Sequence, residues 1–199
     1  MARSEAGASA FGVAGPSQEA TPSDLSADGT VTILFSDISD YTGLTERLGD
    51  RVVQEMLFEH RHMVRSCVSL HGGREVKAQG DGFMLAFAGV ARALRCAAAI
   101  QRSLAERAIQ RPELSISVHM GVHTGEAMLD GGDYTGHTVI LASRLADVAA
   151  PGEVLVSSVV KQLVARSREF DFGPVREVAL KGLKDLEPAA PFVWDSDRA

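Results

Sequence analysis

The sequence has few of the features that mark disulfide-bonded, membrane-spanning or nucleic-acid-binding proteins. Its two cysteines, Cys67 and Cys96, lie in apolar helical patterns without a CxxC spacing, so we expect buried free thiols. No apolar run approaches the roughly 20 residues that span a bilayer, and the first residues lack the apolar core of a signal peptide. We therefore expect a cytoplasmic protein with no membrane partner. The net charge of −6 argues against a nucleic-acid partner.

The pattern of apolar residues predicts one domain with short tails. Residues 1–28 are rich in Gly, Ala, Ser and Pro, so we expect a disordered tail or linker, then a domain at 29–195 and a tail at 196–199. The first half of this domain reads strand, helix, strand, strand, helix, strand, at about 29–37, 42–69, 74–79, 82–87, 88–108 and 114–124. Further helices are expected at about 138–148 and 157–166, and strands at 153–156, 174–181 and 190–194. This order is typical of an α+β, ferredoxin-like (split βαβ) fold, an antiparallel sheet with helices on one face.

Two aspartates stand at chain reversals beside apolar strands. Asp37 ends the run Val31–Ser36, and Asp81 lies between two glycines in the turn of a predicted hairpin. Because the first and third strands of a ferredoxin-like fold are neighbours, we expect the two carboxylates to meet. Such a pair suits hard cations such as Mg²⁺, and a two-metal clamp on a phosphoryl group is the first hypothesis. The alternative is two turn aspartates that bond to their own backbone.

Five segments resemble, in order, the motifs of class III nucleotidyl cyclase catalytic domains. They are Phe35–Thr42, Lys77–Met84, Gly121–Glu126, Gly132–Gly136 with Ala142–Leu145, and Lys181–Leu183. The similarity covers about residues 29–194, and five ordered motifs are far more specific than any one of them. The resemblance implies a lyase that converts a nucleoside triphosphate to a 3′,5′-cyclic monophosphate and pyrophosphate. It also implies a head-to-tail homodimer with active sites shared between the chains.

The resemblance also implies a role for each matching residue. The metal site would comprise Asp37, Ile38 and Asp81 and hold two Mg²⁺ or Mn²⁺ ions, which activate the ribose 3′-hydroxyl and steady the triphosphate. The helix start would offer backbone N–H groups to phosphate oxygens at Ile38, Ser39, Asp40, Tyr41 and Thr42. Arg144 would stabilise charge on the α-phosphate, and Lys181 would reach the β- and γ-phosphates.

The hydrogen-bonding character of Lys77 and Asp133 indicates which base the site binds. A lysine offers only donors and an ionised aspartate only acceptors, whereas adenine presents an acceptor at N1 and a donor at N6. Guanine presents the opposite pattern and would leave buried polar groups unpaired. We therefore expect ATP as substrate and adenylate cyclase activity. Guanylate cyclase activity is an alternative that this pair disfavours.

One position departs from the family pattern. Cyclases usually carry asparagine four residues before the arginine, where it orients the ribose, and here that residue is Ile140. Losing one preorganised contact of this kind lowers turnover by about 10²–10³. His137 and Thr138 are candidates to compensate. We therefore expect a slow cyclase, in which Asp37 and Asp81 come from one chain and Lys77, Asp133 and Arg144 from the other. The alternative is a degenerate, nucleotide-binding regulatory module.

Overall fold

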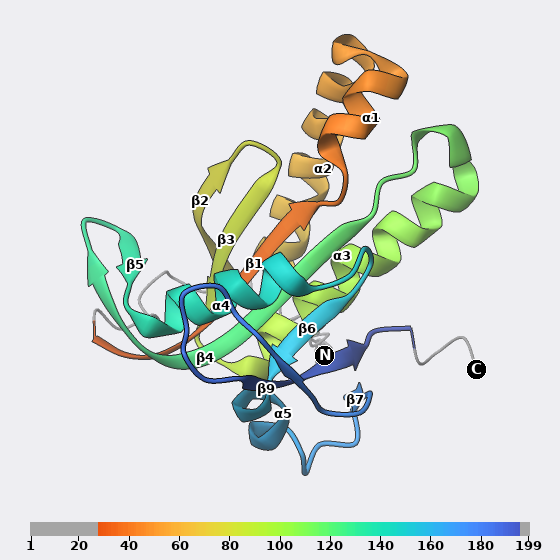
Figure 1. Cartoon of the computed structure of the whole chain (residues 1–199). Coiled ribbons are helices and arrows are strands. Elements are labelled where there is room, and N and C mark those ends of the chain that lie inside the picture. The colour runs from red at the N-terminus through yellow and green to blue at the C-terminus, as the bar shows by residue number, and fades with distance from the viewer. Residues whose placement is uncertain (1–27, 196–199) are drawn as a thin grey trace, which may run out of the picture.

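A mixed sheet organises the chain in the computed structural model, which describes residues 28–195 (Figure 1). Its strands run in the order β2-β3-β1-β4-β6-β9-β7, with β5 beside β4 and β8 beside β9. The strands are β1 (Asp28–Ile38), β2 (Gly73–Gln79), β3 (Gly82–Phe87), β4 (Val118–Asp130), β5 (Asp133–Thr135), β6 (Val154–Ser157), β7 (Asp171–Phe172), β8 (Arg176–Val178) and β9 (Glu187–Val193). The helices are α1 (Tyr41–Leu48), α2 (Asp50–Leu70), α3 (Val90–Gln110), α4 (His137–Val148) and α5 (Ser158–Leu163), with a short 3₁₀ helix at Pro112–Leu114.

The predicted α+β order is confirmed, and β1 does lie beside the third strand. It pairs antiparallel with β3 on one side and with β4 on the other. The sheet is not antiparallel throughout, because β4 and β6 run parallel. A parallel pair needs a crossover connection, and α4 supplies it. The tails predicted at 1–28 and 196–199 lie outside the described residues, except for Asp28, which begins β1.

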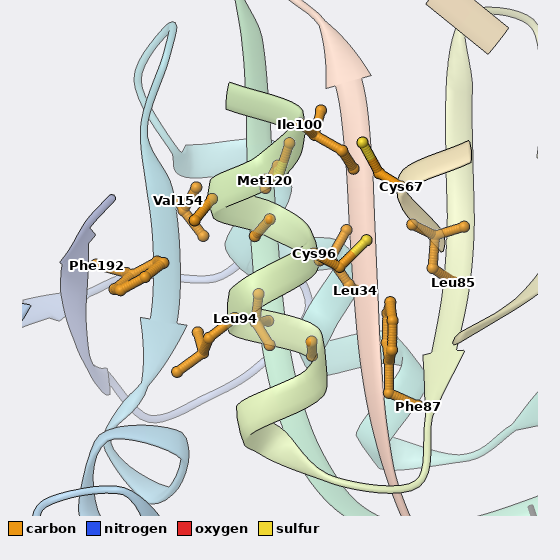
Figure 2. Packing of buried hydrophobic residues seen from close by; sticks show 14 of the residues in the cluster. Leu34, Cys67, Leu85, Phe87, Leu94, Cys96, Ile100, Met120, Val154 and Phe192 are labelled. Carbon is orange, nitrogen blue, oxygen red and sulfur yellow. The ribbon is translucent and has the colours of Figure 1, made fainter. Parts of the chain in front are cut away.

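The helices cover both faces of the sheet, not one as expected. The largest core cluster joins α2, α3 and α5 to the sheet, and Figure 2 shows Leu94, Cys96 and Ile100 of α3 above the strands. On the opposite face, α4 packs against residues of β1, β3, β5 and β6. A glycine in β4 makes this approach possible, since a Cβ on Gly121 would lie 2.2 Å from the backbone nitrogen of Ala146.

Several element boundaries differ from the sequence prediction, and for two of them the backbone shows the reason. The helix expected over 42–69 is interrupted at Gly49, whose φ of +79° favours glycine and separates α1 from α2. The fourth strand begins at Val118 and continues to Asp130 without a break at Gly125. The reason is that β1 pairs with β4 along its whole length, from Asp28↔Met128 to Ile38↔Val118.

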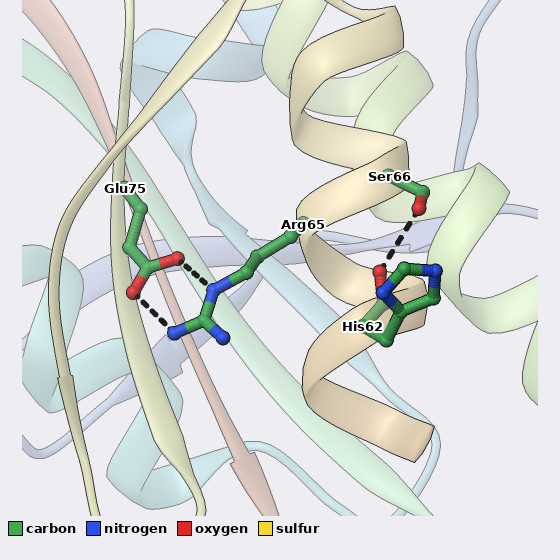
Figure 3. Close-up of polar contacts among 4 residues, drawn as sticks. All are labelled: His62, Arg65, Ser66 and Glu75. Carbon is green, nitrogen blue, oxygen red and sulfur yellow. Dashed lines mark hydrogen bonds and ion pairs between the residues drawn. The ribbon is translucent and has the colours of Figure 1, made fainter. Parts of the chain in front are cut away.

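The outer strand β2 is tied to the helix layer by an ion pair. Arg65 of α2 donates from Nε and Nη2 to the two carboxylate oxygens of Glu75, at 2.7 and 2.9 Å (Figure 3). Hydrogen bonding to Arg65 lowers the pKa of Glu75 below its usual value. A two-point contact fixes orientation as well as distance. This contact therefore helps to position β2, which carries Lys77.

Candidate active site

The structure brings the two predicted metal-binding aspartates together. Asp37 lies near the end of β1, and Asp81 occupies the turn between β2 and β3. Burial, then the charge of Asp81 and a hydrogen bond with it, raise the pKa of Asp37 to about 6. An oxygen of Asp37 also lies over Gly82, where a Cβ would approach it to 3.0 Å. Two carboxylates in contact repel each other unless a proton or a cation lies between them.

The donor set fits a hard cation that keeps other oxygen ligands. No cluster of three or more His, Cys, Asp or Glu side chains suited to a metal occurs within residues 28–195. Asp37 and Asp81 would therefore hold Mg²⁺ or Mn²⁺ only with help from backbone carbonyls, water or phosphate oxygens. Mg²⁺ is commonly bound in this way, through one or two carboxylates and a substrate phosphate.

Part of the segment after Asp37 already forms hydrogen bonds within the protein. Ile38 is buried and pairs with Val118, and the Ser39 N–H donates to the carbonyl of Ser117 at 2.8 Å. Ser39 Oγ also lies 2.9 Å from Nδ1 of His119. The predicted phosphate donor at Ser39 is thus occupied in this conformation.

The helix start itself has an unusual cap. Asp40 adopts φ +55° and accepts a hydrogen bond from the Gly43 N–H at 3.3 Å. This arrangement uses the side chain to satisfy one of the donors at the start of α1. Tyr41 packs against the core, and Thr42 is exposed in the first turn.

The two predicted base-selecting residues bind each other. Lys77 Nζ lies 2.7 Å from Oδ2 of Asp133, although the residues are 56 positions apart. Both side chains are about half exposed, at 48% and 42%. The other carboxylate oxygen of Asp133 is buried and has no hydrogen-bond partner within the described residues. The donor and the acceptor therefore stand at hydrogen-bonding distance on one chain.

Arg74 is a positioning residue that the sequence analysis missed. Its guanidinium carbon lies 5.2 Å from the centre of the Tyr134 ring, and its Nη2 donates to the carbonyl of Gly132 at 3.2 Å. These contacts fasten the turn that carries Asp133 to strand β2. Residues three apart on a strand normally face opposite sides, but a bulge between Glu75 and Lys77 places Arg74 and Lys77 toward the same hairpin. A bulge of this kind leaves no clear signal in one sequence.

The remaining predicted residues lie on α4 and near β8. Arg144 donates from Nη1 to Asp147 at 2.7 Å, so its guanidinium is engaged on its own helix. Ile140 is 48% exposed on the same helix. Lys181 is exposed in the turn between β8 and β9. The structure as described does not bring Lys181 into contact with the aspartate pair.

The two candidates for replacing the missing asparagine have different surroundings. Thr138 is buried and donates its hydroxyl to the carbonyl of Glu126, so that hydroxyl already has a partner. His137 is exposed at the first turn of α4. Only His137 therefore has a side chain that remains available on this surface.

A cleft of about 220 Å³ lies between Asp37 and Lys77 of the same chain. Its lining includes Asp37, Lys77, Met84, His119, Ser143 and Asp147. Burial lowers the pKa of His119, although the charges of Asp147 and Asp81 oppose this effect. The cleft thus combines acidic oxygens at one end with a lysine at the other.

Comparisons with known proteins identify the family of this chain. The sequence model of the adenylate and guanylate cyclase catalytic domain matches residues 24–189. An uncharacterized protein of Mycobacterium tuberculosis is 32% identical over 176 residues, which cover 88% of this chain and 44% of that protein. The putative adenylate cyclase 3 of Rhizobium meliloti is 30% identical over 170 residues, or 84% of this chain and 28% of that protein. The chain therefore spans less than half the length of these relatives.

Solved structures show the same fold. An adenylate/guanylate cyclase/hydrolase from Silicibacter pomeroyi superposes with a TM-score of 0.75 at 28% identity, covering 83% of this chain and 97% of that one. The adenylyl cyclase CyaB from P. aeruginosa gives a TM-score of 0.73 at 24% identity, covering 82% and 93%. Within the described residues, no helix has the length and apolar character needed to cross a membrane. The chain belongs to the adenylate and guanylate cyclase catalytic domain family.

Proposed function

We propose that this chain is an adenylate cyclase that converts ATP to 3′,5′-cyclic AMP and pyrophosphate. The observation that carries the proposal is the Lys77–Asp133 pair, which holds a donor and an acceptor side by side on a chain that also pairs Asp37 with Asp81. Adenine fits this pair, because Lys77 would donate to N1 and Asp133 would accept from N6. Guanine would meet a donor with a donor and an acceptor with an acceptor.

The Lys77–Asp133 ion pair would open to admit the base. Pairs between such exposed side chains contribute about 0–1 kcal/mol, so separating them is a small penalty that two new hydrogen bonds offset. Arg144 would likewise leave Asp147, a similarly exposed partner, to reach the α-phosphate. These pairs give Lys77, one oxygen of Asp133 and one terminal nitrogen of Arg144 a partner, whereas Oδ1 of Asp133 and Nε of Arg144 are buried without one among the described residues.

Asp37 and Asp81 would hold two Mg²⁺ or Mn²⁺ ions. These ions would lower the pKa of the ribose 3′-hydroxyl and neutralise phosphate charge. The 3′-hydroxyl would lose its proton to solvent, and its oxygen would form a bond to the α-phosphorus as the bond to the leaving pyrophosphate breaks. Arg144 would stabilise the negative charge that gathers on the α-phosphate oxygens during this exchange. Backbone N–H groups at the start of α1, and Lys181 after a movement of its turn, would bind the remaining phosphates.

The proposal includes a homodimer with composite sites. A cleft of about 220 Å³ is smaller than the roughly 300–1,000 Å³ of sites that enclose drug-sized ligands. Apolar side chains also stand exposed on the elements around it: Met128 of β4, with Ile140 and Val148 of α4. A second chain would cover these residues and enlarge the site.

Mixing two inactive variants tests the shared sites. We expect Asp37→Ala and Lys77→Ala each to be inactive alone, because each damages both sites of its own homodimer. Random exchange of subunits should restore about a quarter of wild-type turnover, since half of the dimers would hold one intact site of two. Mixing Asp37→Ala with Asp81→Ala is the matched control, and it should restore nothing.

The outcomes separate the parts of the proposal. Turnover by Asp37→Ala or Asp81→Ala alone would refute the metal role. Absence of rescue in a heterodimer verified by differential tagging would refute shared sites. Equal turnover of ATP and GTP under Mg²⁺ or Mn²⁺ would refute the role of Lys77 and Asp133 in base selection.

Ile140 favours a second candidate function, a nucleotide-binding module without turnover. Its side chain cannot hydrogen-bond to a ribose, and the hydroxyl of the neighbouring Thr138 is engaged by Glu126. Calorimetry of ATP binding beside a cyclic-AMP assay distinguishes the two functions. Binding without product at high enzyme concentration and with Mn²⁺ would establish the module.

A further inference from the structure

A second cavity lies on the opposite face of the sheet from α4. It has a volume of about 220 Å³ and is formed by α2, α3 and the segment that leads into β4. Met56, Met63, Leu104 and Ile116 supply apolar walls, while Ser103 and Gln110 supply polar atoms. An apolar cavity of roughly 150 Å³ is large enough for benzene, so this one has room for a molecule of about two fused rings.

The cavity contains a buried histidine whose hydrogen-bonding capacity is unused. His60 is 2% exposed and lines the cavity, and neither of its ring nitrogens has a hydrogen-bond partner among the described residues. Burial lowers its pKa to about 4, so the ring is neutral at pH 7 and offers one donor and one acceptor. Buried polar groups are nearly always hydrogen-bonded, and both nitrogens are shielded from solvent as the ring stands, so a ligand in the cavity would reach one of them after the ring turns.

The charged groups at the cavity are already paired in part. Arg107 forms an ion pair with Glu59, and Glu106 brings a further negative charge to the lining. An anionic ligand would meet this acid and compete with Glu59 for Arg107. A neutral ligand would instead contact the apolar walls and the neutral imidazole of His60. The cavity therefore suits a neutral ligand better than an anionic one.

The same stretch of α2 contacts the turn that carries Asp81. The His60 ring meets Phe83 edge-on, with centroids 6.0 Å apart, and Arg61 donates to the carbonyl of Gly80. Consecutive residues of α2 thus touch Gly80, before Asp81, and Phe83, the second residue of β3 after it. A ligand that orders His60 would act on this turn through packed side chains.

We propose that this cavity binds a small neutral molecule with an aromatic or branched apolar body and one hydroxyl or ring N–H that hydrogen-bonds to His60. We further infer that its occupancy adjusts the position of the Asp81 turn, a step that rests on the proposed cyclase activity. The binding itself does not depend on that activity. Such a ligand would satisfy the imidazole while it fills the apolar walls.

Indole and benzothiophene provide a matched pair of probes, because they share a shape and only indole carries an N–H donor. We expect indole to shift the ¹⁵N resonances of the His60 ring in the full chain and to bind about fivefold more tightly than benzothiophene. His60→Phe keeps an aromatic ring at this position and removes both nitrogens, so it should abolish that preference. His62→Phe, at an exposed histidine on the same helix (Figure 3), is the control and should leave it intact.

Each result decides the proposal. If neither probe moves the His60 resonances at 10 mM, or if the ring proves to be bonded to water that indole does not displace, binding is refuted. A His60→Phe protein that fails to fold leaves the wild-type comparison of the two probes as the test. If indole binds but cyclic-AMP turnover changes less than about twofold, the site stands and its coupling to Asp81 is rejected. If the protein has no turnover at all, the NMR result still decides binding.

Discussion

Neutralising Asp37 should stabilise the metal-free protein while it removes activity. The carboxyl of Asp37 has its pKa raised from 3.8 to about 6, first by burial and then by Asp81. Between about pH 4 and pH 6 the folded protein holds this proton more firmly than the unfolded chain does. Its stability therefore falls as the pH rises through that window, and the full penalty is present at pH 7.

The size of the effect follows from the pKa shift. About two units correspond to roughly 3 kcal/mol for a fully buried group, at 1.36 kcal/mol per unit. Asp37 is only partly buried, so solvent screening leaves about 1–1.5 kcal/mol. For a domain of this size that is a rise in Tm of roughly 2–5 °C. Asp37→Asn should show this rise at pH 7.5 without metal and none at pH 4.

Thermal unfolding across pH 4–8, with and without Mn²⁺, measures the prediction. Mn²⁺ should raise the Tm of the wild type at pH 7.5 and leave Asp37→Asn unchanged, because the cation needs both carboxylates. Asp130→Asn removes one exposed carboxylate elsewhere and is the control for net charge. A lower Tm for Asp37→Asn at pH 7.5, or the same gain at pH 4 as at pH 7.5, would refute the reasoning.

Three further substitutions test particular contacts. Ile140→Asn should raise turnover by about 10–10²-fold. Its free energy of unfolding, measured by thermal unfolding, should change by less than about 0.5 kcal/mol, because the side chain is 48% exposed. Unchanged turnover would show that this position does not limit the rate. Arg74→Gln should lower the preference for ATP over GTP about tenfold, mainly through KM, and an unchanged ratio of kcat/KM values would exclude a positioning role. Gly121→Ala should lower the free energy of unfolding in urea by about 3 kcal/mol, because the new Cβ would meet backbone atoms of α4. Gly89→Ala is the control: its Cβ would have open space, so the free energy should hardly change. Equal effects of the two substitutions would contradict the packing described.

The meeting of Asp37 and Asp81 could be predicted from the sequence, because it depends on strand order alone. The alternation of apolar residues identified the strands, and a ferredoxin-like order makes β1 and β3 neighbours whatever the side chains are. The motif order likewise assigned Lys77 and Asp133 to one base-reading site, but the ion pair between them was not predicted and is a finding of the structure. These features follow from patterns that extend over several residues.

Other features depend on single backbone geometries that a sequence does not display. The role of Arg74 depends on the bulge after Glu75, which changes the side of the strand that it faces. The division of one expected helix into two depends on φ at Gly49, and many helices tolerate a glycine. The position of α4 depends on the absence of a side chain at Gly121, which from sequence looked like a motif residue only.

The contact of α4 with β4 limits how this protein can be regulated. Backbone meets backbone at Gly121, so no layer of side chains is present there to let the helix slide or tilt over the sheet. Arg144 and Asp147 therefore travel with the sheet that bears Asp37. In the homodimer that we propose, deforming this contact within one chain is costly, so an activating signal would act by moving the two chains relative to each other.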